Sequence, residues 1–370
     1  MEKKKKLLCI LHLPPPVHGS SMVGRYIKDS VKINYEFNTK YINLGTSKSI
    51  GDVGKKPLSK IISYLKIVFK TIKQLILFKP DIVYLAITAK GIGFYKDFII
   101  ALITKLFGIQ LVLHFHNKGV QLYQHKKIDN FLYKTVFKKA KVILLSKFLY
   151  PDIQKYVSKE NVYYCANGVP LLNTFDNVKV KSNKKVQLLF LSNLIESKGV
   201  FILLQALNNL QKREFDFTCN FVGGVGDITE NDFNNKVKYF ELEKNVFYLG
   251  KKYDKEKFDI FSNSDIFILP SFYENECFPL VLLEAMQFGL PLISTYEGAI
   301  PEIIEDGVNG FLLKQKNTDT LTSKLEILIN DKQLRSKMGE AAYDKYIKNY
   351  KLEIFESNML KILNKSLNKE

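Results

Sequence analysis

The chain has 370 residues, too many for one ordinary hydrophobic core, and 46% of them are apolar, so length and composition exclude a disordered protein and predict two globular domains. The charge is uneven: residues 1–170 carry 29 Lys and Arg against 9 Asp and Glu, a net charge of +20, whereas residues 171–370 carry 26 against 28, a net charge of −2. The basic half contains no zinc-finger, KH or RNP-like motif, which argues against nucleic acid as its partner and favours an anionic membrane surface.

The N-terminus, MEKKKKLLCILHLPPP, has only a superficial likeness to a secretory signal. Its apolar run is short, contains a histidine and is followed by three prolines instead of a small-residue cleavage site, so it predicts a buried first strand after a basic tail. The chain has no run of about 18 apolar residues, and its four cysteines lack metal-like spacing. We therefore expect a cytoplasmic protein with reduced thiols, associated with the inner face of the membrane.

Residues 56–79, KPLSKIISYLKIVFKTIKQLILFK, place apolar side chains at helical spacing with lysines between them. The apolar stripe consists of Ile61, Ile62, Leu65, Val68, Phe69, Ile72, Leu75 and Ile76. A helix that lies on an anionic membrane has this pattern. A helix that packs on a core and has a solvated back has it too, so the sequence leaves both interpretations open.

Short apolar runs alternate with helical patterns along the whole chain, which is typical of α/β domains with parallel sheets. The predicted strands are LLCILHL, DIVYLAI, LVLHFH and KVILLS in the first half, and VQLLFLS, FTCNFVG, VFYLG, DIFILP, PLIST and GFLLK in the second. A polar, turn-rich segment separates the two sets, which predicts a first domain over 1–168, a linker over 169–185 and a second domain over 186–347. A helical pattern begins near residue 317, breaks near Gly339 and resumes at YKLEIFESNML.

Ligands of parallel sheets bind beyond the carboxyl ends of the strands, so the residues after each strand are the candidates for a site. After the first strand, PPPVHGSS contains Gly19, which allows the backbone to approach an anion closely. Ser20 and Ser21 are predicted to cap a helix that begins near Met22.

Two histidines lie on one face of the predicted strand LVLHFH. His116 stands at its carboxyl end and is a candidate for the site, although a hydrogen-bonded core histidine is the competing interpretation. His114 fits the core interpretation better. The sequence offers no third ligand beside them, which argues against a metal.

Lys198 and Gly199 lie in the turn that opens a helix in LSNLIESKGVFILLQAL. The helix dipole disfavours a cation at this end, so a bound anion would explain the lysine. Exposed lysines are common, however, and this motif by itself is weak.

Seven residues, CFPLVLL, separate Glu276 from Glu284. Pro279 fits the first position of a helix, where its missing N–H costs nothing. The neighbouring backbone N–H groups would then form an anion site suited to a diphosphate; they belong to Phe278, Leu280 and Val281. A carboxylate can hold a vicinal diol, so each glutamate could grip one end of a nucleotide sugar. Two solvated or capping glutamates are the alternative, which explains Glu276 but explains Glu284 poorly within the apolar run VLLEAM.

The block ENECFPLVLLEAMQFGLPLISTYEGAIPEII resembles the E-x7-E region of retaining glycosyltransferases with the GT-B fold, and is most like glycosyltransferase family 4, the glycosyl transferases group 1. The likeness extends over most of the chain. It includes the PPPVHGSS loop, the strand that ends at His116, the segment CANGVP, the KG motif at Lys198 and the segment DGVNGFLL.

The resemblance implies an α/β protein of two facing Rossmann-like domains with parallel sheets and a cleft between them. The first would bind the acceptor and the second a nucleotide-diphosphate sugar, and a C-terminal helix, 348–370, would pack back on the first domain. The implied reaction is transfer of the sugar, with retention, to a glycan or lipid-linked acceptor in cell-surface polysaccharide synthesis. Neither a metal nor another cofactor would be required.

The resemblance also implies roles for individual residues. Glu284 would bind the ribose, Glu276 would bind the transferred sugar, and Glu276 and His116 would be the catalytic residues at the reacting centre. The diphosphate would be held by Gly19, Asn193, Lys198, Cys277, Phe278, Pro279 and Leu280.

One residue departs from the family pattern. The family has G-R-L before the KG motif, whereas this chain has Ser192-Asn193-Leu194. Asparagine can hydrogen-bond a phosphate but brings no charge, so the donor affinity is left open. Asn193 is the argument for one alternative, a turnover-deficient nucleotide-sugar- or glycan-binding protein. A non-transferring GT-B enzyme such as a nucleotide-sugar epimerase is the other alternative that stays open. The base, the sugar, the acceptor and the linkage are not specified by the sequence.

Overall fold

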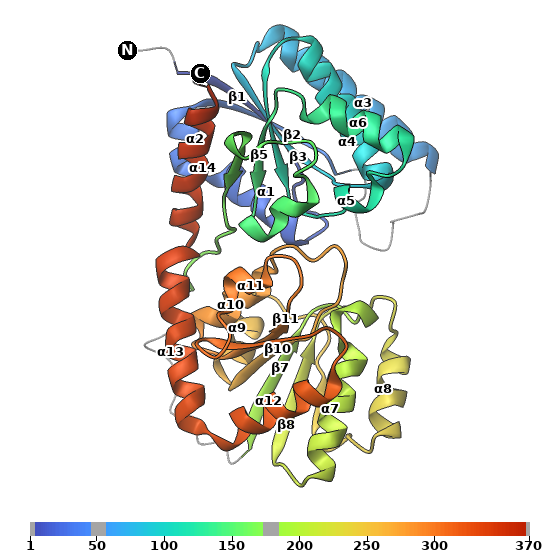
Figure 1. The fold of residues 1–370 in the computed structure, drawn as a ribbon, viewed down its shortest axis with the longest axis vertical. Coiled ribbons are helices and arrows are strands. Elements are labelled where there is room, and N and C mark those ends of the chain that lie inside the picture. Colours follow the sequence, from blue (N-terminus) through green and yellow to red (C-terminus); the bar gives the residue numbers. More distant parts are fainter. Residues whose placement is uncertain (1–3, 46–56, 173–184, 368–370) are drawn as a thin grey trace. The chain divides into compact units, whose positions relative to one another are not determined.

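The computed structural model describes residues 4–45, 57–172 and 185–367, and the chain forms two compact units. The first unit comprises residues 1–168 and 352–370, and the second comprises residues 169–351. Each unit contains one six-stranded parallel sheet with helices packed on it (Figure 1). Most of the predicted linker, residues 173–184, lies outside the described residues.

The sheet of the first unit has the strand order β2-β1-β3-β4-β5-β6. Its strands are β1 (Lys6–Leu11), β2 (Asn38–Asn43), β3 (Ile82–Ile87), β4 (Gln110–Phe115), β5 (Lys141–Leu144) and β6 (Val162–Tyr164). The central strand β3, IVYLAI, is buried along its whole length, as expected for a parallel strand with helices on both faces. From β1 the chain passes to β2 on one side and then to β3 on the other, so the topological switch point lies between β1 and β3.

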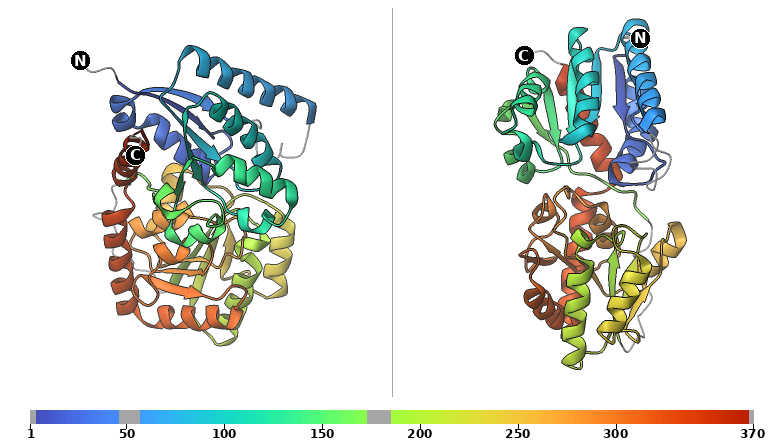
Figure 2. Two further views of the ribbon diagram at one scale, coloured as in Figure 1. Left: turned by 45° about the horizontal axis from the view of Figure 1, so that its top comes forward. Right: turned by 90° about the vertical axis from the view of Figure 1, so that its right-hand side faces the viewer.

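Helices cover both faces of this sheet. The helices α3 (Pro57–Leu77), α4 (Gly91–Leu106) and α6 (Lys127–Phe137) lie side by side on one face (Figures 1 and 2). On the other face lie α1 (Gly19–Asp29), α2 (Val31–Glu36) and the C-terminal α14 (Leu352–Leu367), and α5 (Val120–Tyr123) follows β4. Lys32 on α2 donates to the Glu353 carbonyl at 3.2 Å and to the Ser357 hydroxyl at 2.8 Å, so α14 packs on the first unit.

The sequence analysis missed two strands, and both are edges of this first sheet. In β2, NTKYIN, only Ile42 is fully buried, and β6 has just three residues, VYY. An edge strand has fewer neighbours and a more exposed surface, so it lacks the continuous apolar run that identifies a central parallel strand.

The sheet of the second unit has the order β12-β11-β10-β7-β8-β9, with its switch point between β7 and β10. Its strands are β7 (Val186–Leu191), β8 (Phe217–Val222), β9 (Val246–Tyr248), β10 (Ile266–Leu269), β11 (Leu292–Thr295) and β12 (Gly310–Leu313). Its helices are α7 (Val200–Lys212), α8 (Glu230–Tyr239), α9 (Asp254–Ser262), α10 (Leu280–Gln287), α11 (Ile300–Ile303), α12 (Thr318–Asn330) and α13 (Lys332–Asn349). All six strands were predicted from the sequence, and the prediction of a parallel α/β sheet is confirmed.

The predicted helix break near Gly339 is wrong, because α13 runs through this residue. A Cβ at Gly339 would lie 2.0 Å from the Gly289 carbonyl oxygen, just after α10. This glycine therefore serves close packing of α13 against that turn and does not end a helix. The helices break instead at Asp331, which caps α13, and at Tyr350, which ends it.

The four cysteines are buried, as expected for small core residues. None of the helices in the described part of the chain combines the length and the apolarity that crossing a membrane requires.

Candidate active site

The loops after β7 and β10 meet at the switch point of the second unit. The backbone N–H of Phe272 donates to the Ser197 carbonyl at 2.7 Å, which joins the two loops. Gly199 has φ +87°, and a Cβ there would lie 2.3 Å from the Pro270 carbonyl oxygen. Only glycine allows this turn to close against the end of β10. The turn presents Lys198, the last residue of a short 3₁₀ segment, at the carboxyl edge of the sheet.

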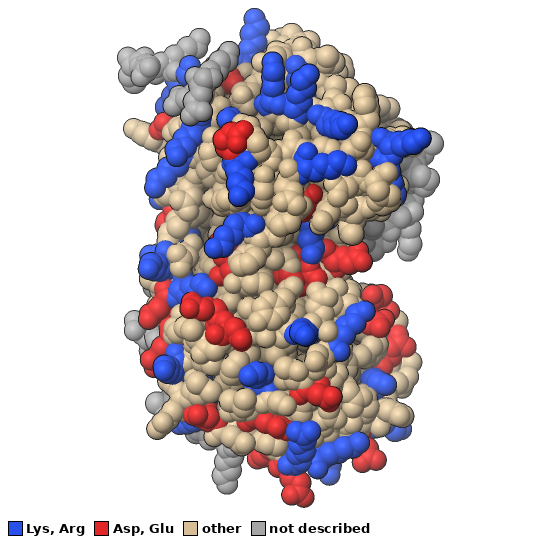
Figure 3. Space-filling model, viewed as in Figure 1, with Lys and Arg blue, Asp and Glu red and all other residues tan. Residues whose placement is uncertain are grey.

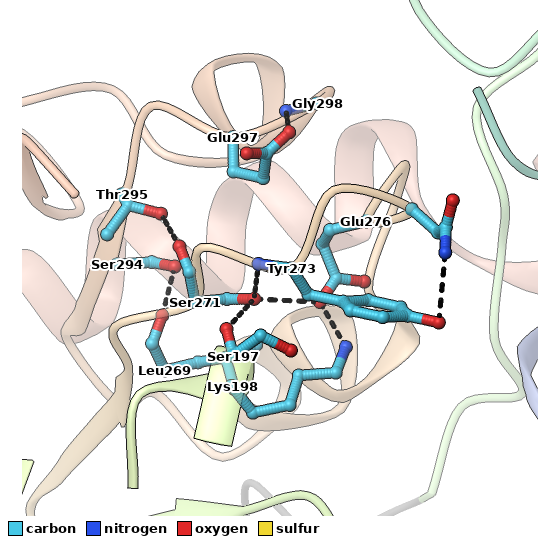
Figure 4. A network of polar contacts seen from close by, with 11 residues as sticks. Ser197, Lys198, Leu269, Ser271, Tyr273, Glu276, Ser294, Thr295, Glu297 and Gly298 are labelled. Carbon is cyan, nitrogen blue, oxygen red and sulfur yellow. Dashed lines mark hydrogen bonds and ion pairs between the residues drawn. The ribbon is translucent and has the colours of Figure 1, made fainter. Parts of the chain in front are cut away.

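Lys198 and Glu276 form an ion pair in the polar network that fills this place (Figure 4). The Lys198 Nζ contacts Glu276 Oε2, and the Ser271 hydroxyl donates to the same oxygen at 3.3 Å. The two charged side chains are only 15% and 9% exposed, so their attraction is weakly screened. The Nζ also lies 4.7 Å from the Tyr273 ring centroid, a cation–π contact. The structure thus brings Lys198, which was predicted to bind the diphosphate, into contact with Glu276, which was predicted to bind the sugar.

The helix α10 starts one residue later than predicted. It begins at Leu280, and Pro279 is its N-cap rather than its first helical residue. Pro279 has no N–H, so its backbone cannot donate to a phosphate. The first N–H groups of α10 have no acceptor within the helix and are suited to an anion. The segment before the helix is fixed, because the Cys277 carbonyl accepts from Ala299 N at 2.7 Å and Phe278 is buried.

Glu284 lies on α10 and is paired with a lysine that the sequence analysis did not single out. The Lys257 Nζ on α9 lies 2.8 Å from Glu284 Oε1, and the two side chains are 21% and 18% exposed. Lys257 stands in the charged run DKEK, and nothing in that run distinguishes it from a solvated lysine. The alternative interpretation required Glu284 to be a solvated residue or a helix cap. Because Glu284 is mostly buried and paired with Lys257, it is neither.

Asn193 stands at the carboxyl end of β7 and fixes the neighbouring glycine loop. Its side-chain oxygen accepts from the Gly224 N–H at 3.0 Å, and the Leu194 N–H donates to the Gly224 carbonyl at 2.7 Å. Its Oδ1 is thereby used by the protein, while its amide N–H groups are the donors available to a ligand.

In the first unit, His116 follows β4 directly, close to three other histidines. Its ring centroid lies 4.1 Å from that of His114, and His12 and His18 lie 6.0 Å apart. Burial, with smaller contributions from the neighbouring His12 and His18, lowers the pKa of His116 to about 3. Its imidazole is therefore neutral near pH 7. Across the described ranges of the chain, no three His, Cys, Asp or Glu side chains group as ligands of a metal.

His114 has the core role that the sequence favoured. It is fully buried, its Nδ1 lies 2.8 Å from the Tyr84 hydroxyl, and burial holds its pKa well below the usual range.

The loop after β1 differs in detail from the prediction. The helix α1 begins at Gly19, not near Met22, and its cap is His18 instead of Ser20 or Ser21. The His18 ring accepts from the Ser21 N–H at 3.3 Å, and the Ser21 hydroxyl accepts from the His18 N–H at 3.0 Å. A Cβ at Gly19 would meet nothing within 4 Å, so protein packing does not require glycine at this position.

Comparison with known proteins places the second unit beside sugar-transferring enzymes. Residues 173–345 match the family model described as glycosyl transferases group 1. A curated relative, an uncharacterized glycosyltransferase of Haemophilus influenzae, is 30% identical over 188 residues, which cover 50% of this chain and 51% of the relative. N-acetyl-alpha-D-glucosaminyl L-malate synthase of Bacillus anthracis is 30% identical over 194 residues, which cover 52% of this chain and 48% of that enzyme. The chain thus spans about half the length of these curated relatives.

The likeness to solved structures covers nearly the whole chain. The structure of Anabaena HepE in complex with UDP has a TM-score of 0.74 at 18% identity and covers 98% of this chain and 100% of that one. At this level of identity the likeness establishes the fold and nothing further. The two parallel sheets and this neighbour together confirm the predicted GT-B fold of two Rossmann-like domains.

Proposed function

We propose that this protein is a retaining glycosyltransferase that moves a sugar from a nucleotide-diphosphate sugar to a glycan or lipid-linked acceptor of the cell surface. The observation that carries the proposal is the Lys198–Glu276 pair at the switch point of the second unit. Glu284 lies further along α10 in the same unit, and all three residues fall within the segment that matches the group 1 model.

Each residue has a chemical task in this proposal. Lys198 and the start of α10 hold the diphosphate and stabilise the charge that develops on it as the sugar leaves. Glu284 holds the ribose diol, and Glu276 holds hydroxyls of the transferred sugar. The bond between the anomeric carbon and the phosphate oxygen breaks, a bond to the acceptor oxygen forms on the same face, and the leaving phosphate takes the acceptor proton. His116 at the end of β4 has a neutral imidazole, which can donate one hydrogen bond and accept another.

The scheme invokes no metal: Lys198 and the helix-start N–H groups contact the diphosphate directly. The UDP bound in the HepE structure supports testing UDP-sugars first. GDP- and ADP-sugars complete the set.

The test is product analysis with labelled UDP-, GDP- and ADP-sugars and a lipid-linked acceptor, with and without EDTA. We expect label in the acceptor, an unchanged anomeric configuration by NMR and the same rate in EDTA. The Glu276→Gln variant is the control for turnover. An epimerised nucleotide sugar without transfer would instead support the epimerase, and binding without any turnover would support the binding protein.

We also propose that the first unit attaches to the anionic inner face of the membrane. The core interpretation and the membrane interpretation of residues 56–79 do not exclude each other, because α3 has one buried and one exposed apolar face. One packs on the core through Ile67 and Leu75, so Leu75 does not belong to the surface stripe. The other is exposed and includes Ile61, Ile62, Leu65, Phe69 and Ile76, with Lys66, Lys70 and Lys73 beside it.

Exposed apolar side chains also occur on two other helices of the first unit. They include Ile92, Ile99 and Leu106 on α4 and Ile128 and Phe131 on α6. Exposed apolar side chains beside lysines are suited to the boundary between headgroups and acyl chains.

A further inference from the structure

The proposed diphosphate site is short of positive charge. Its one assigned cation, Lys198, already contacts the Glu276 carboxylate. Asn193 is uncharged, and its side-chain oxygen is occupied by the Gly224 N–H. A diphosphate is strongly anionic, so a further cation would strengthen its binding in a site that has no metal.

Lys251 lies beside this gap. It follows β9, whose partner in the sheet is β8, so its backbone stands at the same carboxyl edge as Asn193 and Gly224. Its Nζ lies 3.3 Å, and the Asn193 Oδ1 3.2 Å, from the point that a Cβ on Gly224 would occupy. The lysine side chain thus crosses the glycine loop and ends next to the asparagine.

Gly224 permits this arrangement. A Cβ at that position would lie 2.3 Å from the Lys251 Cε, so any other residue would push the lysine away. The neighbouring Lys252 behaves differently, because its Nζ lies 2.7 Å from Glu256 Oε1. Among the described residues, no carboxylate forms an ion pair with Lys251.

We propose that Lys251 binds the diphosphate of the donor and supplies the positive charge that Asn193 does not. The inference rests on the proposed function and deepens it. Lysine is a compact charge on a flexible stem, so Lys251 can reach a phosphate oxygen from the end of β9. An arginine at position 193 would reach the same oxygen from the end of β7, two strands away. The same loop could therefore place the positive charge on a lysine at position 251 or on an arginine at position 193.

The experiment measures binding of UDP, GDP and ADP, and of the matching nucleoside monophosphates, by calorimetry. The variants are Lys251→Ala, Lys252→Ala as the matched control, Gly224→Ala, Asn193→Arg and the double variant Lys251→Ala/Asn193→Arg. Circular dichroism and thermal unfolding check that each variant is folded.

We expect Lys251→Ala to weaken the diphosphate that the wild type prefers by roughly tenfold and its monophosphate by less. Lys252→Ala should change neither. Gly224→Ala should weaken the diphosphate while every charge is retained, because it displaces the lysine. Asn193→Arg should restore binding in the Lys251→Ala background more than it tightens the wild type, a non-additive result that identifies one shared charge.

Two outcomes would overturn the inference and are distinguishable from each other. If the wild type binds a nucleoside diphosphate and the Lys251 and Lys252 variants bind it equally, Lys251 is an ordinary solvated lysine and the proposed function stands. If the wild type binds none of the three diphosphates, the proposed function fails and the inference fails with it.

Discussion

Glu276 and Glu284 are each held by a lysine, and this arrangement predicts different consequences when each carboxylate is removed. Glu284→Gln removes one charge from the proposed ribose acceptor and should weaken the nucleoside diphosphate and the intact donor alike, by roughly one to two decades. Glu276→Gln releases Lys198 from its partner, so the affinity for the nucleoside diphosphate should be unchanged or higher while turnover falls. Calorimetry with the nucleoside diphosphate and rates with the full donor separate the two profiles.

The matched control for these two variants is Glu256→Gln. Glu256 is an exposed glutamate on α9, and among the described residues its ion pair is with Lys252. It should behave as the wild type in both assays. If Glu276→Gln and Glu284→Gln gave one common profile in folded protein, the assignment of the carboxylates to different parts of the donor would be wrong.

The histidines of the first unit predict that the free energy of unfolding falls at acid pH. Burial, followed by the charges of His18 and Lys96, lowers the pKa of His12 to about 4, and burial lowers the pKa of His116 to about 3. The unfolded chain binds these protons near pH 6.5, so the stability of the neutral rings is complete above that pH and is lost as pH falls. Asp97 acts in the opposite direction, because burial raises its pKa to about 6 and the folded chain takes up its proton first.

We therefore expect His12→Gln to flatten the fall in unfolding free energy between about pH 6.5 and about pH 4, by at most about 1.4 kcal/mol per pH unit. Urea unfolding at a series of pH values measures the slope. His125→Gln, at an exposed position, is the control and should leave the slope as it is. Parallel profiles for the wild type and the His12 variant would contradict the prediction.

At the level of single residues, the sequence predicted the site residues that belong to motifs with a chemically meaningful spacing. It did not predict the lysines that lie beside those residues in the folded chain. Glu276 and Lys198 were assigned from the E-x7-E block and the KG turn, and the structure puts them in contact. Lys257 and Lys251 could not be found, because an exposed-looking lysine in a lysine-rich chain carries no local signal. Their significance comes from strands and helices that only the folded sheet places side by side. The cap of α1 was missed for a similar reason, since histidine is not a preferred capping residue.

Among the helices, α13 offers a test of packing. Alanine normally stabilises a helix relative to glycine by about 0.5–1 kcal/mol. At Gly339 the added Cβ would collide with the Gly289 carbonyl, so Gly339→Ala should instead destabilise the protein by about 1–3 kcal/mol. The control is Gly19→Ala in α1, where no atom lies within 4 Å and stability should change by less than about 0.5 kcal/mol. Urea midpoints of both variants decide the question, and a stabilised Gly339→Ala would show that α13 does not press on that turn.

The strands were predictable where the sequence shows an apolar run. The strand β7, VQLLFL, has such a run, and so does the edge strand β12, whose four residues are all buried. The edge strand β2 presents polar side chains at most of its positions, so its identity depends on pairing with β1, a tertiary contact. The helix break predicted at Gly339 was wrong because glycine has two common roles in helices. It often follows the end of a helix, but it also permits close packing within one.

Charge separates the two halves of the whole molecule. The surplus of +20 lies in the first 170 residues, and Lys and Arg gather over the first unit on the face that Figure 3 shows. Each lysine near an anionic surface contributes about 1 kcal/mol, and salt weakens the effect. The exposed apolar face of α3 would add a contribution that salt does not remove, because it depends on area and not on charge.

We therefore predict two separable components of membrane binding. Vesicles that contain anionic lipid should bind the protein, those of neutral lipid should bind it weakly, and raising the salt from about 0.05 M to about 0.5 M should release most of it. Phe69→Glu places a charge on the exposed face of α3, where Phe69 is 71% exposed, and should reduce binding at both salt concentrations. Tyr239→Glu makes a similar change at a 74% exposed aromatic of the second unit and should bind as the wild type does. Co-sedimentation of the three proteins measures all of these amounts. Equal binding to neutral and anionic vesicles, or equal losses in the two variants, would show that α3 is an ordinary solvated surface and that its lysines have no lipid partner.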